Sequence, residues 1–304
     1  MSAVDERLTR RKMLKGAAVG AGSLALASCA PDSNNRDGVA VTRVMKVPTD
    51  DPDHHTWRLT AAKSIPLGPQ DMALPQQLSP SIAEVRVRAV HDGIRIGFQL
   101  EWDDPDVNDL TVRVDDYRDA CAVLLAPGIA VDALRTMGSP TTPATLLHWK
   151  ADWQRDVDFG RQGLDAVYPN RSIDTYPILH DVAPEDVDAS SYVEAGATEW
   201  LPGLYVGNPM SASDRNTPVE KAIAYSFSTT TTAAHQDATG RGIRTATGWR
   251  VILTKPLTAA DDGELAIPTG WTSTCAFAVW SGSKRDAGSR KCPARTVHAL
   301  SVAP

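Results

Sequence analysis

Residues 84–100 of this chain read EVRVRAVHDGIRIGFQL. Apolar residues alternate with charged or polar residues on both sides of Asp92-Gly93. An alternation with a period of two is typical of a strand that is buried on one face. Because Asp-Gly favours a tight turn between two such strands, residues 85–100 predict a β-hairpin.

The segments that follow predict more strands. A continuous apolar run at residues 120–126 indicates a strand that is buried on both faces and ends at Pro127. Residues 248–254, 274–280 and 297–302 indicate three further strands. Many short strands without a long amphipathic helix predict an all-β fold, an antiparallel β-sandwich with long loops.

Composition narrows the class of protein. The chain has 304 residues, of which 42% are hydrophobic, and this is enough for a substantial core. Its formal charge is −6 and its sequence pI is about 5.6. This acidic balance argues against a nucleic-acid partner, which would require a basic face.

The first 29 residues resemble an export signal. Arg10 and Arg11 precede an uncharged stretch of small and apolar residues, 16–27, that is too short to cross a bilayer. The stretch ends in the sequence LASC, which resembles a lipobox. We therefore predict a twin-arginine lipoprotein signal peptide at residues 1–28 and lipidation of Cys29. An uncleaved N-terminal anchor helix is the alternative.

Removal of the signal peptide would change the charge and define the domains. Residues 1–28 hold five Lys or Arg and two Asp or Glu, so the formal charge falls from −6 to −9. We interpret residues 29–56 as a lipidated tether, because they are polar and lack periodicity, and residues 57–304 as the folded domain. The expected location is the outer face of the cytoplasmic membrane, or the periplasm, with the lipid anchor in contact with the membrane surface.

Two segments contain candidate ligands for a metal. Residues 135–140 read RTMGSP and place Met137 in a loop of Gly and Pro. A thioether is a soft, neutral ligand that suits haem iron, although most methionines fill gaps in cores. After the strand at 274–280, basic residues cluster in a region that could pair with cofactor carboxylates or form a solvated hairpin tip: Lys284, Arg285, Arg290, Lys291 and Arg295.

Eight segments, in this order and spacing, resemble one known family: residues 87–102, 117–123, 137–138, 149–151, 207–209, 218–220, 248–251 and 276–283. The family is that of the haem b-binding subunit of ethylbenzene dehydrogenase. It includes the small subunits of dimethyl sulfide dehydrogenase, selenate reductase and chlorate reductase. The similarity extends from about Val85 to the C-terminus.

The resemblance implies a β-sandwich, similar to a carbohydrate-binding module, that holds haem b between a methionine and a lysine. The methionine corresponds to Met137 and the lysine corresponds best to Lys291. The family usually continues from this lysine into Ser, whereas Cys292-Pro293 follows here, so Lys284 stays open as the second ligand. Covalent c-type haem is excluded because the chain has no Cys-x-x-Cys-His motif.

The resemblance also implies a role. Two axial ligands leave no open position on the iron, so such a subunit transfers electrons and has no substrate chemistry of its own. Its partners in the family are an iron–sulfur subunit and a molybdenum catalytic subunit, and this chain could also be a free-standing relative. A lysine can ligate iron only as a neutral amine, which requires a lowered pKa.

Two questions remain open from the residues alone. A β-sandwich of this kind could instead be an exported binding module without haem that stacks sugars on Trp149, Trp153 and Trp200. Besides Cys29 the chain has three cysteines, an odd number, and the disulfide pairing of Cys121, Cys275 and Cys292 stays open, although Cys275 could face Cys292 across a hairpin. Nothing resembles the catalytic motif of a hydrolase.

Overall fold

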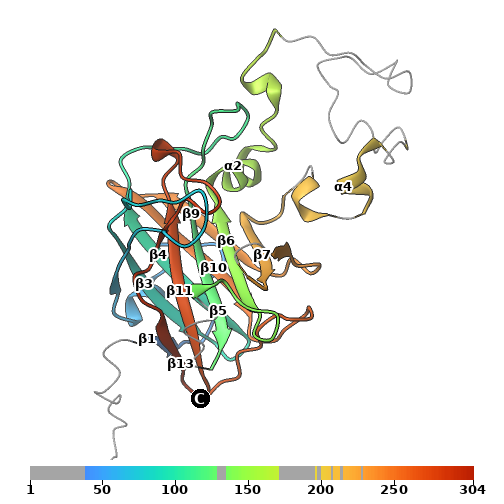
Figure 1. Ribbon diagram of the computed structural model, residues 1–304. Coiled ribbons are helices and arrows are strands. Elements are labelled where there is room, and N and C mark those ends of the chain that lie inside the picture. Colours follow the sequence, from blue (N-terminus) through green and yellow to red (C-terminus); the bar gives the residue numbers. More distant parts are fainter. Residues whose placement is uncertain are drawn as a thin grey trace, which may run out of the picture. The chain divides into compact units, whose positions relative to one another are not determined.

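The computed structural model describes residues 38–128, 135–170, 196, 200–206, 208–212, 215–226 and 229–304. In this part of the chain thirteen strands form one sheet (Figure 1). They are β1 (Val39–Arg43), β2 (Lys63–Pro66), β3 (Glu84–His91), β4 (Arg95–Asp103), β5 (Ala120–Pro127), β6 (Ala144–Lys150), β7 (Val219–Ala224), β8 (Thr230–Thr232), β9 (Thr239–Arg244), β10 (Gly248–Pro256), β11 (Thr272–Trp280), β12 (Cys292–Pro293) and β13 (His298–Val302).

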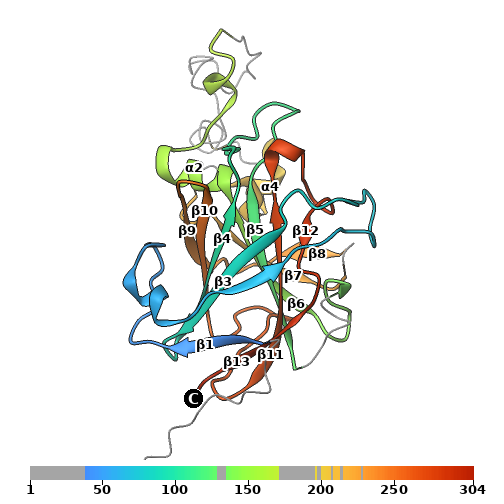
Figure 2. The ribbon, with the colours of Figure 1, turned by 90° about the vertical axis from the view of Figure 1, so that its left-hand side faces the viewer.

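The sheet folds over so that its two halves pack face to face (Figures 1 and 2). The order of its strands is β8-β7-β6-β5-β11-β13-β1-β3-β4-β10-β9, with β2 on β3 and β12 on β11. Aromatic rings join the layers: Phe98 on β4 contacts Phe277 on β11, with 6.4 Å between centroids. Trp149 on β6 contacts both Trp102 and Trp249. The predicted all-β sandwich is confirmed, with the qualification that β1 runs parallel to β3 and β13.

The predicted hairpin is the pair of strands β3 and β4. Val85, Val87 and Ala89 are buried, as the alternation requires. At the turn the Asp92 carboxylate accepts hydrogen bonds from the backbone N–H groups of Ile94 and Arg95. Gly93 has a φ of 88°, which glycine adopts without a Cβ penalty.

Strand β5 is buried on both faces, as its continuous apolar run predicted. Cys121, Val123 and Leu125 point into the main core between the layers. Ala120 and Ala122, with their alternating neighbours, belong to a second apolar cluster on the outer side of the same layer. This outer cluster carries the candidate site.

The folded domain begins before residue 57, contrary to the predicted tether at 29–56. Val39 and Val41 are buried in β1, and the 3-10 helix η1 (His55–Leu59) buries Trp57. Trp57 packs with Val47 on the outer side of the other layer. Strand β1 was not recognised in the sequence because its alternating pattern spans only five residues. Its two parallel partners are also far away along the chain.

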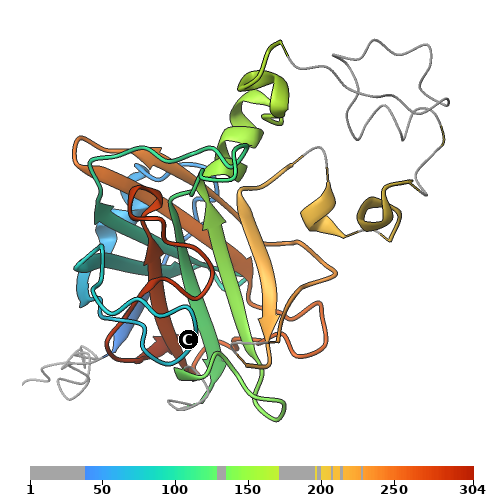
Figure 3. The same cartoon turned by 45° about the horizontal axis from the view of Figure 1, so that its top comes forward.

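Short helices complete the described part of the chain: α2 (Ala151–Phe159), α4 (Pro202–Tyr205), η2 (Leu164–Ala166), η6 (Pro209–Ser211) and η7 (Gly282–Lys284). Helix α2 continues directly from the end of β6 (Figures 2 and 3). No helix among the described residues is long and apolar enough to cross a membrane. The twin-arginine segment and Cys29 lie outside the described residues.

The three described cysteines are buried and free. A bridge between Cys275 and Cys292 does not form, because β12 pairs with β11 in a register that sets Cys292 opposite Val279. Cys275 lies four residues earlier on β11, opposite Leu125. The register of the hairpin is therefore shifted by four residues from the one in which the two cysteines would face each other.

Candidate functional site

The outer side of the layer formed by β5, β6, β7 and β11 is built mainly from small side chains. Because the strands are paired in register, their alternate residues form one continuous face. The buried residues of this face, here called the alanine face, are Ala120, Ala122, Leu124, Ala126, Ala144, Leu146, Ala222, Ala224, Ala278 and Trp280. Seven of its ten side chains are alanines, which project little from the backbone of these strands.

Met137 packs on the alanine face from the loop between β5 and β6. It has a positive φ of 57°, and Gly138 follows with a φ of 86°. A Cβ on Gly138 would lie 1.9 Å from the carbonyl oxygen of Ala224, so only glycine allows the loop to approach β7 this closely. Ser139 and Thr142 close the loop with paired backbone hydrogen bonds. The loop thus fixes the thioether over the face.

Lys291 contacts Met137 from a segment near the C-terminus. It precedes β12, and its Nζ lies 3.0 Å from the Sδ of Met137, although 154 residues separate the two. Lys284 is exposed in η7, and no contact joins it to Met137. The structure therefore brings Met137 together with Lys291, the better of the two lysines by sequence.

The amine of Lys291 is in a setting that disfavours its charge. The residue is half-buried, and burial around the amine lowers its pKa to about 8. Within the described part of the chain no carboxylate forms an ion pair with it, and its nearest aromatic ring, Trp280, has its centroid 5.9 Å from Nζ. A thioether is only a weak hydrogen-bond acceptor. The amine of Lys291 therefore loses its proton more readily than the amine of a solvated lysine.

Two buried carboxylates hold the segment that carries Lys291. Asp286 accepts hydrogen bonds from the backbone N–H of Ser281, at 3.1 Å, and from the side chains of Gln77 and Ser81. Asp119 accepts from the N–H of Gly282 at 2.9 Å, and from Asn108 and Trp249. Burial raises the pKa of Asp119 to about 6. The sequence assigned a role to neither residue, although Asp119 lies directly before the apolar run and within residues 117–123, which resemble the family.

The residues present fit a haem held by Met and Lys. The pair supplies one thioether and one amine, facing each other above an apolar floor. Both side chains reach the same point on the alanine face, and they would hold the iron of a haem there. The described residues offer no cluster of three His, Cys, Asp or Glu for a metal of another kind.

The three tryptophans of the alternative interpretation do not form one surface. Trp149 is fully buried in the main core, and Trp153 is 5% exposed. The ring of Trp153 contacts the Nζ of Lys150 and the guanidinium of Arg215, each at 3.9 Å. Trp200 is the exposed one of the three, at 53%. A sugar platform built from these three residues is therefore not present in the structure.

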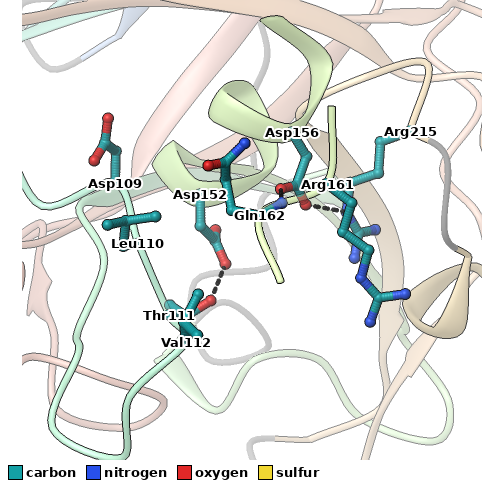
Figure 4. A pocket seen from close by; sticks show the side chains of 9 residues that line it. All are labelled: Asp109, Leu110, Thr111, Val112, Asp152, Asp156, Arg161, Gln162 and Arg215. Atoms are coloured by element: carbon teal, nitrogen blue, oxygen red, sulfur yellow. Dashed lines mark hydrogen bonds and ion pairs between the residues drawn. The ribbon is translucent and has the colours of Figure 1, made fainter. Parts of the chain in front are cut away.

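A polar pocket lies beside α2 (Figure 4). Two of its carboxylates already have partners: Asp152 accepts from Thr111 at 2.7 Å, and Asp156 pairs with Arg215 at 3.1 Å. Neither Met137 nor Lys291 lines it. Its lining is polar, whereas the candidate site lies on the apolar alanine face, so the pocket and the candidate site are separate.

A family model described as ethylbenzene dehydrogenase matches residues 54–292. This chain belongs to the ethylbenzene dehydrogenase family. The match covers most of the chain and includes both Met137 and Lys291. Membership fits a subunit of an oxidoreductase complex. No curated protein matches the chain.

Proposed function

We propose that this member of the ethylbenzene dehydrogenase family is an electron-transfer subunit that holds one haem b between Met137 and Lys291. The contact of 3.0 Å between the thioether and the amine carries the proposal. A half-buried lysine that faces a methionine, with no carboxylate partner among the described residues, is costly to maintain unless it binds something.

The properties of the two side chains define what the site can do. A bound haem would supply one-electron redox chemistry. A neutral thioether favours ferrous iron and so raises the reduction potential. Lys291 contributes an amine that loses its proton more readily than a solvated lysine, because its pKa is lowered to about 8. With both Met137 and Lys291 bound to the iron, no position would remain for a substrate, so the subunit would pass electrons and perform no substrate chemistry.

The cellular setting follows from the family and from the N-terminus. We infer partnership with an iron–sulfur subunit and a molybdenum catalytic subunit, as in the complexes that the sequence resembles. The twin-arginine segment supports export in the folded state, and Cys29 supports anchoring by lipid on the outer face of the cytoplasmic membrane.

The ligands are tested by absorption spectra of the purified protein, which should be those of a reducible, low-spin b-type haem. Met137→Ala should give a high-spin ferric form that binds carbon monoxide, with a lower potential. Met210→Ala is the matched control, because Met210 also contacts a lysine but lies off the alanine face. An unchanged spectrum of the haem-loaded Met137 variant would contradict the assignment.

The second ligand is tested in the same way. Lys291→Ala should perturb the low-spin spectrum, whereas Lys284→Ala should have almost no effect because Lys284 is exposed. The reverse result would assign Lys284 instead. Protein that stays free of haem after expression with ample haem and correct export would favour a binding module.

Export and anchoring are tested separately. Cys29→Ser should give a protein that is not lipidated and is released from membranes, and replacement of Arg10 and Arg11 by lysine should block export. Retention of the Cys29 variant on membranes after a salt wash would exclude a lipoprotein anchor.

A further inference from the structure

One ring nitrogen beside the candidate site lacks a partner. His148 lies on β6 opposite Ala122 of β5, and its imidazole stacks on Trp280 with 4.8 Å between centroids. Its Nε2 is shielded from solvent, and no hydrogen-bond partner among the described residues reaches it. The side chain is therefore anchored by stacking while one polar atom is left for another group.

Trp280 connects His148 to the proposed ligands. The same indole that stacks on His148 lies 5.9 Å from the Nζ of Lys291, and its Nε1 donates to the carbonyl of Gly288. Trp280 is thus fixed at both sides. Trp280 therefore contacts both His148 and the amine of Lys291, and that amine in turn contacts Met137.

Three cationic side chains lie near His148. Burial and the nearby charges of Lys150, Arg118 and Lys291 lower its pKa well below the usual value, so the ring is neutral at pH 7. Lys150 pairs with Glu220 and Arg118 pairs with Asp152, so these cations already have anionic partners. A neutral imidazole keeps one N–H to donate. An N–H donor forms stronger hydrogen bonds with an ionised acceptor, such as a carboxylate, than with a neutral one.

We propose that His148 binds a carboxylate of the group held between Met137 and Lys291, with Nε2–H as the donor. For a haem this carboxylate is a propionate. The inference rests on the proposed function and extends it: His148 sets which edge of the haem faces β6. A missing partner is not sufficient by itself, because His91 also has unpartnered ring nitrogens in the core. What distinguishes His148 is its place on the alanine face beside Trp280.

The test compares haem with its dimethyl ester, which lacks free carboxylates. The mature chain is reconstituted with each, and the rate of haem loss to apomyoglobin is measured. In the wild type we expect haem to leave about tenfold more slowly than the ester, as for one hydrogen bond to a charged group. In His148→Phe, which keeps the stack on Trp280, the two rates should converge. His148→Gln, which keeps an N–H donor, should retain part of the difference.

His91→Phe is the matched control, because His91 is a buried histidine on β3 in the other layer, and it should leave the difference between the two haems unchanged. A His148→Phe variant that binds haem with the wild-type spectrum and keeps the tenfold difference overturns the inference and leaves the Met137–Lys291 site standing. A wild-type chain that binds no haem overturns both.

Discussion

Two lysines in this protein share several features of their surroundings and differ in their partners. Burial lowers the pKa of both Lys150 and Lys291 to about 8, and each contacts a methionine sulfur and lies near a tryptophan ring. Lys150 also forms an ion pair with Glu220, at 2.5 Å. Lys291 has no carboxylate partner among the described residues, and its amine approaches the thioether more closely, at 3.0 Å against 3.8 Å.

The difference shows how a buried lysine is assigned a role. A carboxylate partner repays part of the cost of desolvation and keeps the proton on the amine, so Lys150 serves as a structural link between β6 and β7. Without that partner, the cost persists until the amine loses its proton or binds a cation that replaces it. The pKa of both lysines is lowered to about 8, so the pKa does not distinguish them. The carboxylate partner of Lys150 is what distinguishes a structural lysine from a candidate ligand.

The largest effect should come from removing the charge of Lys150. Lys150→Met leaves the Glu220 carboxylate buried without its cation, and we expect a loss of about 3 kcal/mol in the free energy of unfolding. Urea unfolding at pH 7 measures it. Adding Glu220→Gln should recover part of the loss, because the second change removes the unpaired charge. If Lys150→Met leaves the free energy of unfolding unchanged, the ion pair with Glu220 does not explain the difference between the two lysines.

The opposite sign is expected for Lys291 in protein prepared without haem. Lys291→Met removes a charge that is buried without a partner, and the variant should be more stable by about 1 to 2 kcal/mol at pH 7, since the residue is only partly buried. The lowered pKa means that the unfolded chain binds more protons, so the cost is full below about pH 8 and disappears as the pH rises toward 10.5. The advantage of the variant should shrink over that range. An advantage that stays constant with pH would rule out the amine as its source.

The smallest effect should come from the second methionine. Met210 is 40% exposed and contributes only a sulfur contact to Lys150, so Met210→Ala should change the free energy of unfolding by less than about 1 kcal/mol. Thermal unfolding is sufficient to measure it. A loss as large as that of Lys150→Met would show that the thioether, and not Glu220, stabilises the buried amine.

Much of the fold could be predicted because local patterns specify it. The alternation around Asp92-Gly93 required a hairpin, and the continuous apolar run at 120–126 required a strand with two covered faces. Strand β1 was missed because its partners, β3 and β13, are remote in sequence and its own pattern is short. A local pattern specifies a strand but not the strands that flank it.

The sequence by itself determined the family resemblance, the export signal as a prediction, and Met137 with Lys291, or Lys284, as candidate iron ligands. Only the tertiary structure decided that Lys291, and not Lys284, meets Met137, and that Asp119 and Asp286 hold the lysine segment in place. The reason is physical. These contacts join segments far apart in sequence, and they depend on the register of β11 against β5 and β12, which is set by packing across the sandwich and leaves no local periodicity to recognise.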